Sequence, residues 1–411
     1  MKRFSLLHFP VENKTILLRV DFNVPLQKQM QKKASKQTLK HTVVFNYKIK
    51  AALPTIKYLL HKNCKIILAT HLGRPKGFSS DLSVKPIAEE LQRLLPKTNI
   101  IKFNDCIGKE IDERIKKEKP QTIFILENLR FYKEEEQNDP FFAHSLANLA
   151  EIYVNDAFGV AHRRHASVDA ITKFLPSAAG LLFEKELHFL SEGLAPKRPA
   201  VLILGGDKLN KLGLLELALR KYDFILVGGA LAFSFLKAKG ISAGASKTDA
   251  ESIRAARDIL KNRNASKIIL PLDFIAADTF SPDTRTEVVP YNQIKPHQMA
   301  LDLGPETMNL FKKYLQPAKT VVWNGPLGYF KWAKFASATK EIARYIGTLH
   351  DATTIAGGGE TAEALAKCLL QHNFTHVSTG GGAAVAYLSG QKLPAMTALE
   401  GSYKKFKGKI R

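Results

Sequence analysis

Residues 15–24 read TILLRVDFNV, a nearly continuous apolar run that ends in the polar residues Asp21 and Asn23. Such a run is typical of a parallel strand that is buried on both faces and carries a functional loop at its carboxyl end. Similar runs recur along the chain, at 64–72, 121–131, 150–158, 199–208, 222–230, 266–274, 319–326, 351–359 and 375–383. We therefore predict that parallel strands form the framework of the fold.

The segments between these runs show helical periodicity. Residues 46–63 and 249–263, for example, carry apolar residues at three- and four-residue spacing. Alternation of strands and helices along the whole chain predicts an α/β protein. Because a single hydrophobic core rarely grows beyond about 250–300 residues, we expect this chain of 411 residues to form two Rossmann-like domains with parallel sheets.

The two halves of the chain carry different residue types at the ends of their strands. Before about residue 180 the runs end in Asp, Asn, His and Arg, whereas after about residue 200 they end in glycine clusters. Between the halves, residues 181–194 carry apolar residues along one helical face. We predict a long interdomain helix at 182–195, an N-terminal domain at 1–181 and a C-terminal domain at 196–394.

Composition narrows the class of protein. Hydrophobic residues make up 45% and charged residues 24% of the chain, as in ordinary globular proteins. The cysteines, Cys64, Cys106 and Cys368, are scattered and odd in number, which excludes a disulfide scaffold and favours a reducing cytoplasm. No apolar run approaches the roughly 20 residues of a membrane span, so we expect a cytoplasmic protein without a membrane partner.

The formal net charge is +23, which favours anionic partners of every kind. The basic residues are spread along the chain, with local concentrations at 28–50 and in the C-terminal tail. Neither concentration is interleaved with stacking aromatics or matches a known nucleic-acid-binding motif. We interpret them as solvated basic faces and expect no specific nucleic-acid partner.

Basic and polar side chains come directly after several strand runs of the first half: Asp21, Asn23, His71, Arg74, Arg130, His162 and Arg163. Because the carboxyl ends of parallel strands meet at one edge of a sheet, we expect these side chains to lie close together. Guanidinium groups match paired oxygens of carboxylate and phosphate. Each residue alone is open to a structural interpretation, and a metal site is disfavoured by the arginine between the histidines. Their recurrence predicts an anion site.

In the second half, several runs end in glycines that precede a helix: 205–213 (GGDKLNKLG), 321–328 (VVWNGPLG), 354–365 (TIAGGGETAEAL) and 378–388 (STGGGAAVAYL). Glycines let backbone N–H groups approach an oxyanion at a helix N-terminus. One such turn is commonly structural, and neither a Walker A loop nor a dinucleotide fingerprint is present. Their repetition predicts a nucleotide-phosphate site. With an anion site in the other domain, it indicates phosphoryl transfer that requires domain closure.

Several of these motifs resemble the signatures of the phosphoglycerate kinase family, in the same order and spacing: LLRVDFNVPL, KAALPTIKYLL, HLGRPKG, ENLRFYKEEE, YVNDAFGVAHRRHAS, VVWNGPLG, TTIAGGG and STGGGA. The resemblance runs from about residue 14 to residue 400. It implies two α/β domains, a joining helix and a C-terminal tail, 395–411, that returns to the N-terminal domain. It also implies a glycolytic transfer of phosphoryl between ATP and 3-phosphoglycerate, giving 1,3-bisphosphoglycerate and ADP, with Mg²⁺ as cofactor.

The resemblance also assigns residues. For the acid substrate they are Asp21, Phe22, Asn23, Lys48, His71, Leu72, Gly73, Arg74, Arg130 and Arg163. For catalysis they are Lys208, Arg163, Lys48, Gly381 and Gly382. For the nucleotide they are Gly205, Gly206, Lys211, Gly229, Asn324, Pro326, Lys331, Gly358, Gly359, Glu360 and Thr361, with Glu360 as the metal ligand. The nucleophile is the substrate's own carboxylate, and we expect a monomer.

The chain departs from the family pattern at four places. Lys48 replaces an arginine, Lys331 replaces the glutamate for the ribose, and Glu360 replaces the metal-binding aspartate. The segment GGDKLNKL is one residue shorter than usual and contains Asp207 in place of a small residue. Two hypotheses are consistent with these departures: an active but divergent kinase, or a degraded relative that binds phosphate ligands, with an altered nucleotide preference.

Overall fold

The computed structural model describes residues 4–33, 36–206 and 212–409. They form two compact units. Unit 1 comprises Met1–Leu187 and Lys392–Arg411, and unit 2 comprises His188–Gln391. The boundary falls within helix α6, Leu181–Leu194. Among the helices of the described ranges, none combines the length and apolar character that a bilayer crossing needs.

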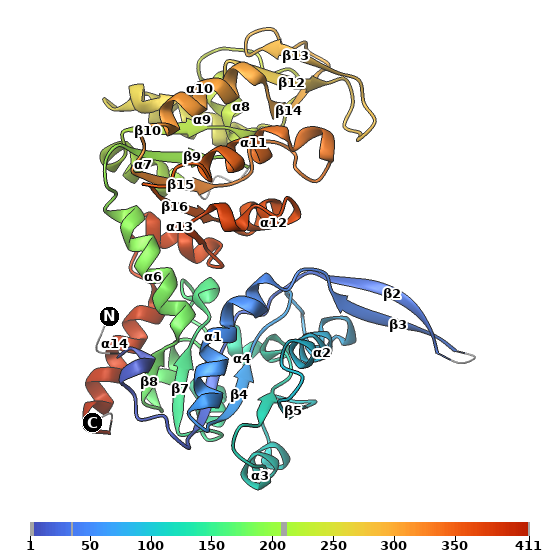
Figure 1. Ribbon diagram of the computed structural model, residues 1–411, viewed down its shortest axis with the longest axis vertical. Coiled ribbons are helices and arrows are strands. Elements are labelled where there is room, and N and C mark those ends of the chain that lie inside the picture. The colour runs from blue at the N-terminus through green and yellow to red at the C-terminus, as the bar shows by residue number, and fades with distance from the viewer. Residues whose placement is uncertain (1–3, 34–35, 207–211, 410–411) are drawn as a thin grey trace. The chain divides into compact units, whose positions relative to one another are not determined.

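Unit 1 is built on a six-stranded parallel sheet with the order β5-β6-β4-β1-β7-β8 (Figure 1). Its strands are β1 Thr15–Arg19, β4 Lys65–Ala69, β5 Ile100–Lys102, β6 Ile123–Ile125, β7 Ile152–Asn155 and β8 Ser177–Ala179. Its helices are α1 Tyr47–His61, α2 Lys85–Leu94, α3 Lys109–Lys117, α4 Lys133–Glu136, α5 Pro140–Ala147 and α14 Pro394–Phe406. Short 3-10 helices are η2 Leu6–His8, η3 Ser80–Leu82, η4 Leu129–Phe131, η5 Phe158–Val160, η6 Ala170–Lys173 and η11 Lys407–Lys409.

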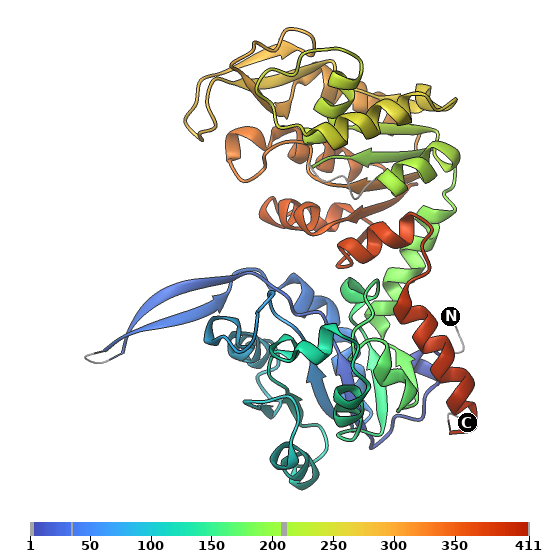
Figure 2. The ribbon, with the colours of Figure 1, turned by 180° about the vertical axis from the view of Figure 1, so that it is seen from behind.

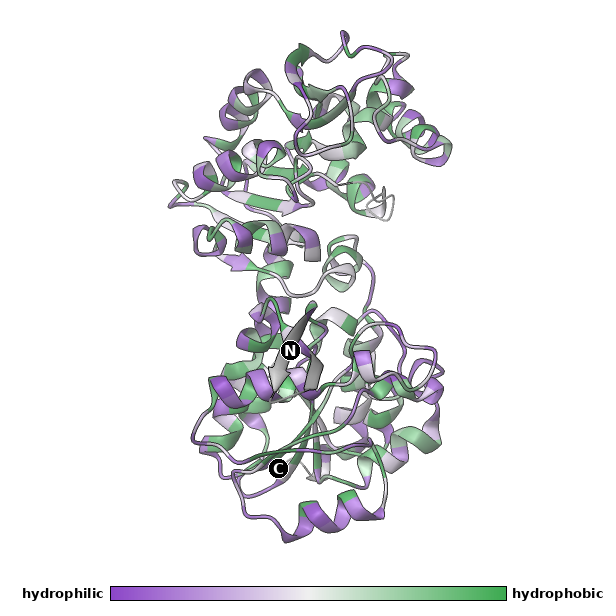
Figure 3. Cartoon of the chain, turned by 90° about the vertical axis from the view of Figure 1, so that its right-hand side faces the viewer, coloured by the Kyte–Doolittle hydropathy of each residue, from purple (hydrophilic) through white to green (hydrophobic). Residues whose placement is uncertain are grey.

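The sheet of unit 1 is covered on both faces, which explains its continuous apolar runs. In β1, Ile16 and Leu18 pack into one buried cluster with Ile56 of α1. The intervening Leu17 packs into a second cluster with Phe142 of α5. Figure 3 shows apolar strands beneath helices whose outer faces are hydrophilic. A strand with both faces buried has no polar alternation, and this sheet obeys that rule.

Helix α14 belongs to unit 1 although it lies at the end of the chain (Figure 2). The Ser402 hydroxyl donates to the Leu175 carbonyl at 3.0 Å, and Lys405 Nζ donates to the Lys173 carbonyl at 2.7 Å. The Ala395 N–H donates to the Ala161 carbonyl at 3.1 Å. The predicted return of the tail to the N-terminal domain is confirmed.

A two-stranded antiparallel hairpin extends from unit 1 (Figure 1). Its strands are β2 Leu26–Lys33 and β3 Lys36–Val43. At its base, Lys28 pairs with Asp81 at 2.7 Å and Lys40 pairs with Glu89 of α2 at 3.0 Å. The basic concentration in this region therefore includes residues that are neutralised by carboxylates of the same unit.

Unit 2 is built on a second six-stranded parallel sheet, with the order β11-β10-β9-β15-β16-β17. Its strands are β9 Ala200–Leu204, β10 Phe224–Val227, β11 Ile268–Ile269, β15 Thr320–Asn324, β16 Thr353–Gly357 and β17 His376–Val377. Its helices are α7 Leu212–Lys221, α8 Gly229–Ala238, α9 Ala250–Leu260, α10 Pro305–Leu315, α11 Ser337–Ile346, α12 Gly359–Lys367 and α13 Gly382–Leu388, and its 3-10 helices are η8 Ala265–Lys267, η9 Ala333–Phe335 and η10 Gln371–Asn373.

A small antiparallel sheet accompanies the parallel sheet of unit 2 and corrects one prediction. It consists of β12 Asp273–Ala277, β13 Thr286–Pro290 and β14 Met299–Leu303, in the order β13-β12-β14. The predicted single parallel strand at 266–274 is wrong, because the run divides between β11 and β12. Pro271 lies at the division, where its missing N–H group prevents continuation of the ladder.

Candidate functional site

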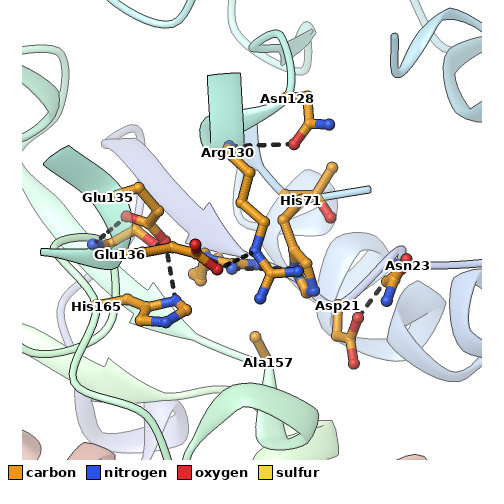
Figure 4. Close-up of polar contacts among 12 residues, drawn as sticks. Asp21, Asn23, His71, Asn128, Arg130, Glu135, Glu136, Ala157 and His165 are labelled. Carbon is orange, nitrogen blue, oxygen red and sulfur yellow. Dashed lines mark hydrogen bonds and ion pairs between the residues drawn. The ribbon is translucent and has the colours of Figure 1, made fainter. Parts of the chain in front are cut away.

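The predicted anion-binding residues of unit 1 lie after the carboxyl ends of its central strands (Figure 4). Asp21 and Asn23 come after β1, His71 to Arg74 come after β4, and Arg130 lies in η4 after β6. All three segments meet at Gly73. Its N–H donates to Asn23 Oδ1 at 3.0 Å, and its carbonyl accepts from Arg130 Nη1 at 2.6 Å. The parallel sheet therefore brings these residues to one edge, as expected.

Asp21 is buried and is held by two contacts. Lys48 Nζ, in the first turn of α1, donates to Asp21 Oδ2 at 2.7 Å, and the Asn23 N–H donates to Oδ1 at 3.2 Å. Burial would raise the pKa of this carboxyl, but the charge of the Lys48 ammonium and the hydrogen bonds from Lys48 and the Asn23 N–H outweigh burial and hold the pKa well below its usual range. Asp21 is thus a carboxylate at neutral pH, and the Lys48 ammonium forms an ion pair with it.

Arg130 is only 6% exposed, yet two nitrogens of its guanidinium lack a hydrogen-bond acceptor among the described residues. Its Nε lies 3.1 Å from Glu136 Oε1, without the geometry of a hydrogen bond. Among the described residues, Nη2 also finds no hydrogen-bond acceptor. Burial, with the charges of Arg163 and Arg19, lowers the pKa of Arg130, and Glu136 opposes this shift. A buried guanidinium with unused donors is suited to bind an oxyanion.

The histidines of this cluster are neutral at pH 7. Burial lowers the pKa of His71 and His162, and lowers that of His165 to about 3. Neighbouring arginines add to each shift. The positive charge available to an anion therefore comes from arginine and lysine side chains.

Arg163 and Arg74 are the more accessible arginines. Arg163 is half-buried and its Nε contacts His162 Nε2 at 3.3 Å, whereas Arg74 is exposed. Phe22 and Leu72 contribute backbone contacts: the Phe22 N–H donates to Thr70 Oγ1 and the Leu72 N–H to Asn128 Oδ1. These bonds fix the loops that carry the charged side chains.

Sequence reasoning missed the buried residues beneath this cluster. Arg19 and Glu135 have no exposed side-chain surface, and both contact Ser167. Their signal in the sequence was a charged residue within an apolar run, LLRV, and the Glu-rich segment after Arg130. Neither signal identifies the residues that Arg19 and Glu135 contact in the fold.

In unit 2 the glycine loops pack directly against one another. The Gly206 N–H donates to the Pro326 carbonyl at 2.8 Å, and the Gly229 N–H donates to the Leu327 carbonyl at 3.1 Å. A Cβ atom at Gly205 would lie 2.1 Å from the Pro326 carbonyl oxygen. Glycine is therefore required at this position for the loops after β9 and β15 to meet.

The loops after β15 and β16 are also joined. Thr361 Oγ1 accepts from the Gly325 N–H at 2.7 Å, and a Cβ at Gly358 would lie 3.2 Å from Asn324 Nδ2. Gly359 and Glu360 begin α12. Gly358 adopts a φ of +95°, which favours glycine.

A cavity of about 470 Å³ lies beside these loops in unit 2. Its lining includes Gly206, Gly229, Pro326, Lys331 and Glu360 from the predicted nucleotide set. Most of the remaining lining is apolar and was not predicted: Ala230, Phe233, Phe274, Phe280, Met299, Leu301, Leu303 and Leu327 among others. Part of it comes from the antiparallel sheet that sequence reasoning missed.

Other members of the predicted set lie elsewhere or outside the described residues. Gly205, Asn324, Gly358, Gly359 and Thr361 support the loops and are not among the residues that line this cavity. Gly381 and Gly382 lie at the start of α13 and are also absent from its lining. Lys208, Lys211 and Asp207 fall outside the described residues.

Comparison with known proteins bears on this arrangement. The family model described as phosphoglycerate kinase matches residues 6–391. A phosphoglycerate kinase of Moorella thermoacetica is 42% identical over 404 residues, covering 97% of this chain and 99% of that protein. A wheat protein described as cytosolic phosphoglycerate kinase is 41% identical, covering 95% and 96%. The crystal structure of phosphoglycerate kinase from Pyrococcus horikoshii matches with a TM-score of 0.84 and 31% identity, covering 98% and 100%.

These matches extend over nearly the whole chain and include both units. The family model, which spans most of the sequence, and the relatives above 40% identity indicate the same fold and the same reaction. The chain belongs to the phosphoglycerate kinase family and has its kinase activity.

Proposed function

We propose that unit 1 binds 3-phosphoglycerate and unit 2 binds the nucleotide in the phosphoryl transfer of this family. The observation that carries the first assignment is the buried Arg130, whose Nη2 has no acceptor among the described residues. An oxyanion would satisfy it, while the positive charge of Arg163 would add to the attraction. The second assignment is supported by the apolar cavity beside the glycine loops.

In the reaction, a carboxylate oxygen of 3-phosphoglycerate attacks the γ-phosphorus of ATP, and the bond from that phosphorus to the ADP oxygen breaks. The acceptor is already a carboxylate, so no side chain has to remove a proton. Catalysis then consists of positioning and charge neutralisation. In this proposal Asp21, Asn23 and Arg130 orient the acid, and the loops around Gly206 and Gly229 hold the nucleotide. Exclusion of water by domain closure remains a prediction.

Mg²⁺ is part of the proposal, and Glu360 fits it. Glu360 is exposed, lines the cavity and begins α12. Magnesium is commonly held by one or two carboxylates together with substrate phosphates. When bound, the ion would neutralise phosphate charge. We propose Glu360 as its protein ligand.

One specific contact motivates the alternative that the kinase activity is degraded. Lys48, which replaces the family's arginine, donates to Asp21, and a lysine cannot form a bidentate fork. Lys331 likewise provides no acceptor for a ribose hydroxyl. Lys48→Arg and Lys331→Glu separate the two hypotheses. A gain in kcat/KM above about 100-fold would indicate a degraded enzyme, whereas a change below about threefold would indicate that the lysines are compensated.

A coupled assay of ADP formation tests the proposed function. We expect turnover that requires ATP, 3-phosphoglycerate and Mg²⁺ together, and a panel of nucleotides would report the preference set by Lys331. No turnover in either direction by a folded sample would contradict catalysis. Binding of each substrate, measured by calorimetry, would then test the binding-only alternative.

We further propose a cytoplasmic monomer that has no nucleic-acid or membrane partner. The wheat relative's description as cytosolic supports the location. Light scattering would measure the mass, and a dimer mass would contradict the proposal. Salt-dependent binding to RNA or to anionic vesicles would contradict the absence of those partners.

A further inference from the structure

A buried polar cluster lies beneath the anion site of unit 1 and has no role in the reaction described above. It consists of Arg19 at the end of β1, Glu135 in α4 and Ser167 after the His162–Arg163 segment. Arg19 and Glu135 are fully buried and Ser167 is 1% exposed. Ionised side chains at such depth are costly unless they are paired, so this cluster requires an explanation.

Glu135 holds Ser167 through both carboxylate oxygens. Its Oε1 accepts from the Ser167 hydroxyl at 2.6 Å and its Oε2 accepts from the Ser167 N–H at 2.9 Å. The Glu135 backbone carbonyl also accepts from the Ala166 N–H at 2.9 Å. Residues 166 and 167 are thereby fixed to α4 by three hydrogen bonds, only a few residues beyond Arg163.

Arg19 extends the cluster to the other side of the anion site. Its Nε donates to Ser167 Oγ at 2.8 Å, and its Nη2 lies 3.2 Å from His71 Nδ1. The same Nη2 lies 3.8 Å from Glu135 Oε1. Figure 4 shows Glu135 beside His165, whose Nδ1 is 3.7 Å from Glu135 Oε1. One carboxylate therefore connects the segment after Arg163 to the loop that carries His71.

We propose that Glu135 is a positioning residue of the 3-phosphoglycerate site, acting through Ser167 and Arg19 to set Arg163 and His71. The inference rests on the proposed function of unit 1. Arg163 lies four positions before Ser167, so a displacement of Ser167 is transmitted over a short length of chain. A misplacement of about 1 Å can cost a factor of about 100 in rate when catalysis depends on positioning.

Glu135 differs in this respect from its neighbour Glu136. The Glu136 side chain is 54% exposed and pairs directly with Arg130. It therefore modulates the charge of a binding residue, whereas the carboxylate of Glu135 contacts Ser167, Arg19 and His165. A change at Glu135 should alter geometry in unit 1 without altering the nucleotide cavity, which lies in unit 2.

The decisive variant is Glu135→Gln. The amide keeps the size of the side chain and one acceptor, but its NH₂ group would face either the Ser167 hydroxyl, which already accepts from Arg19 Nε, or the Ser167 N–H, which is itself a donor. We expect the KM for 3-phosphoglycerate to rise at least about tenfold, with the KM for ATP unchanged within about twofold. Ser167→Ala should act in the same direction. The double variant should be no worse than Glu135→Gln alone, because both changes break one linkage.

Asp273→Asn provides a matched control. Asp273 Oδ1 accepts from both the N–H and the hydroxyl of Thr307, at 2.8 and 2.6 Å, and is buried in unit 2. This variant should lower the unfolding temperature but leave the KM for 3-phosphoglycerate unchanged. If Glu135→Gln does not fold, Ser167→Ala measures the same split between the two KM values.

The outcomes separate this inference from the proposed function. Suppose that the unmodified protein does not turn over 3-phosphoglycerate and that calorimetry detects no binding of it. The proposed function then fails, and the inference fails with it. If it does turn over, but Glu135→Gln leaves the KM for 3-phosphoglycerate unchanged or raises both KM values equally, only the positioning role is overturned. Additive effects of Glu135→Gln and Ser167→Ala would likewise overturn the proposed linkage.

Discussion

The ion pair between Lys48 and Asp21 gives the sharpest prediction for stability. Lys48→Met keeps much of the apolar stem but removes the ammonium that lies 2.7 Å from Asp21 Oδ2. The Asp21 side chain is 8% exposed and that of Lys48 is 26% exposed. The variant would leave a buried carboxylate with the Asn23 N–H as a remaining donor.

The size of the expected loss depends on this partial burial. Removing one partner of a fully buried ion pair costs about 3–5 kcal/mol. Because Lys48 is partly exposed, water can reach the vacated position, and the cost should be nearer about 2–3 kcal/mol. At about 1.4 kcal/mol for each factor of ten, this loss corresponds to a roughly 30- to 140-fold decrease in equilibrium protection.

Native-state hydrogen exchange can measure this loss in each unit separately. We expect faster exchange at the most protected amides of β1 and α1, with unit 2 as the internal reference. Lys28→Met is a matched control, since Lys28 lies at the same 2.7 Å distance from Asp81 but both side chains are more than half exposed. An exposed pair of this kind contributes about 1 kcal/mol or less.

The pH dependence gives a second measure of the same pair. The pKa of Asp21 is lowered in the folded protein, so its stabilisation is present above the ordinary carboxylate pKa of about 3.9 and is lost as the pH falls towards the folded pKa. The difference in the free energy of unfolding between the unmodified protein and Lys48→Met should therefore have its full size at pH 7 and decrease in acid. A difference below about 1 kcal/mol at pH 7, or one that is independent of pH, would refute the reasoning.

Two further predictions concern other buried contacts. Burial raises the pKa of Asp156 to about 7, so the folded state retains a proton that the unfolded chain loses at about pH 4, and unit 1 should lose stability as the pH rises between these values. Urea titrations between pH 4 and 8 should show a flatter dependence for Asp156→Asn, and an equal slope would contradict this. Gly205→Ala would place a Cβ atom 2.1 Å from the Pro326 carbonyl oxygen and should raise the KM for ATP at least about tenfold. Gly401→Ala in α14, whose Cβ would meet no atom within 4 Å, is its control, and an unchanged KM in Gly205→Ala would count against the packing argument.

The sequence predicts the parallel sheets well because their signal is local. A strand buried on both faces must be apolar throughout, and runs such as 15–24 report this directly. The convergence of Asn23, Gly73 and Arg130 is also a consequence of topology, since parallel strands present their carboxyl ends to one edge. Here a pattern along the chain is sufficient to predict proximity in space.

The antiparallel sheet and the buried cluster have no comparable signal. Strand β13 exposes most of its residues, so its sequence shows no continuous apolar run. The partners of Arg19 lie 52 and 148 positions away, at His71 and Ser167. Pairing at such separations depends on packing, which periodicity does not report. The commitment of Lys48 to Asp21 is a contact of the same kind.

The docking of α14 onto unit 1 has a consequence for the newly made chain. More than 200 residues separate Leu187 from Lys392, and at about 5–20 residues per second a ribosome needs roughly 10–40 s to translate that interval. Throughout this delay the nascent unit 1 lacks its last helix and leaves the surface around Leu175 uncovered. Unit 2 can finish folding as soon as it emerges, so the domain begun first is completed last.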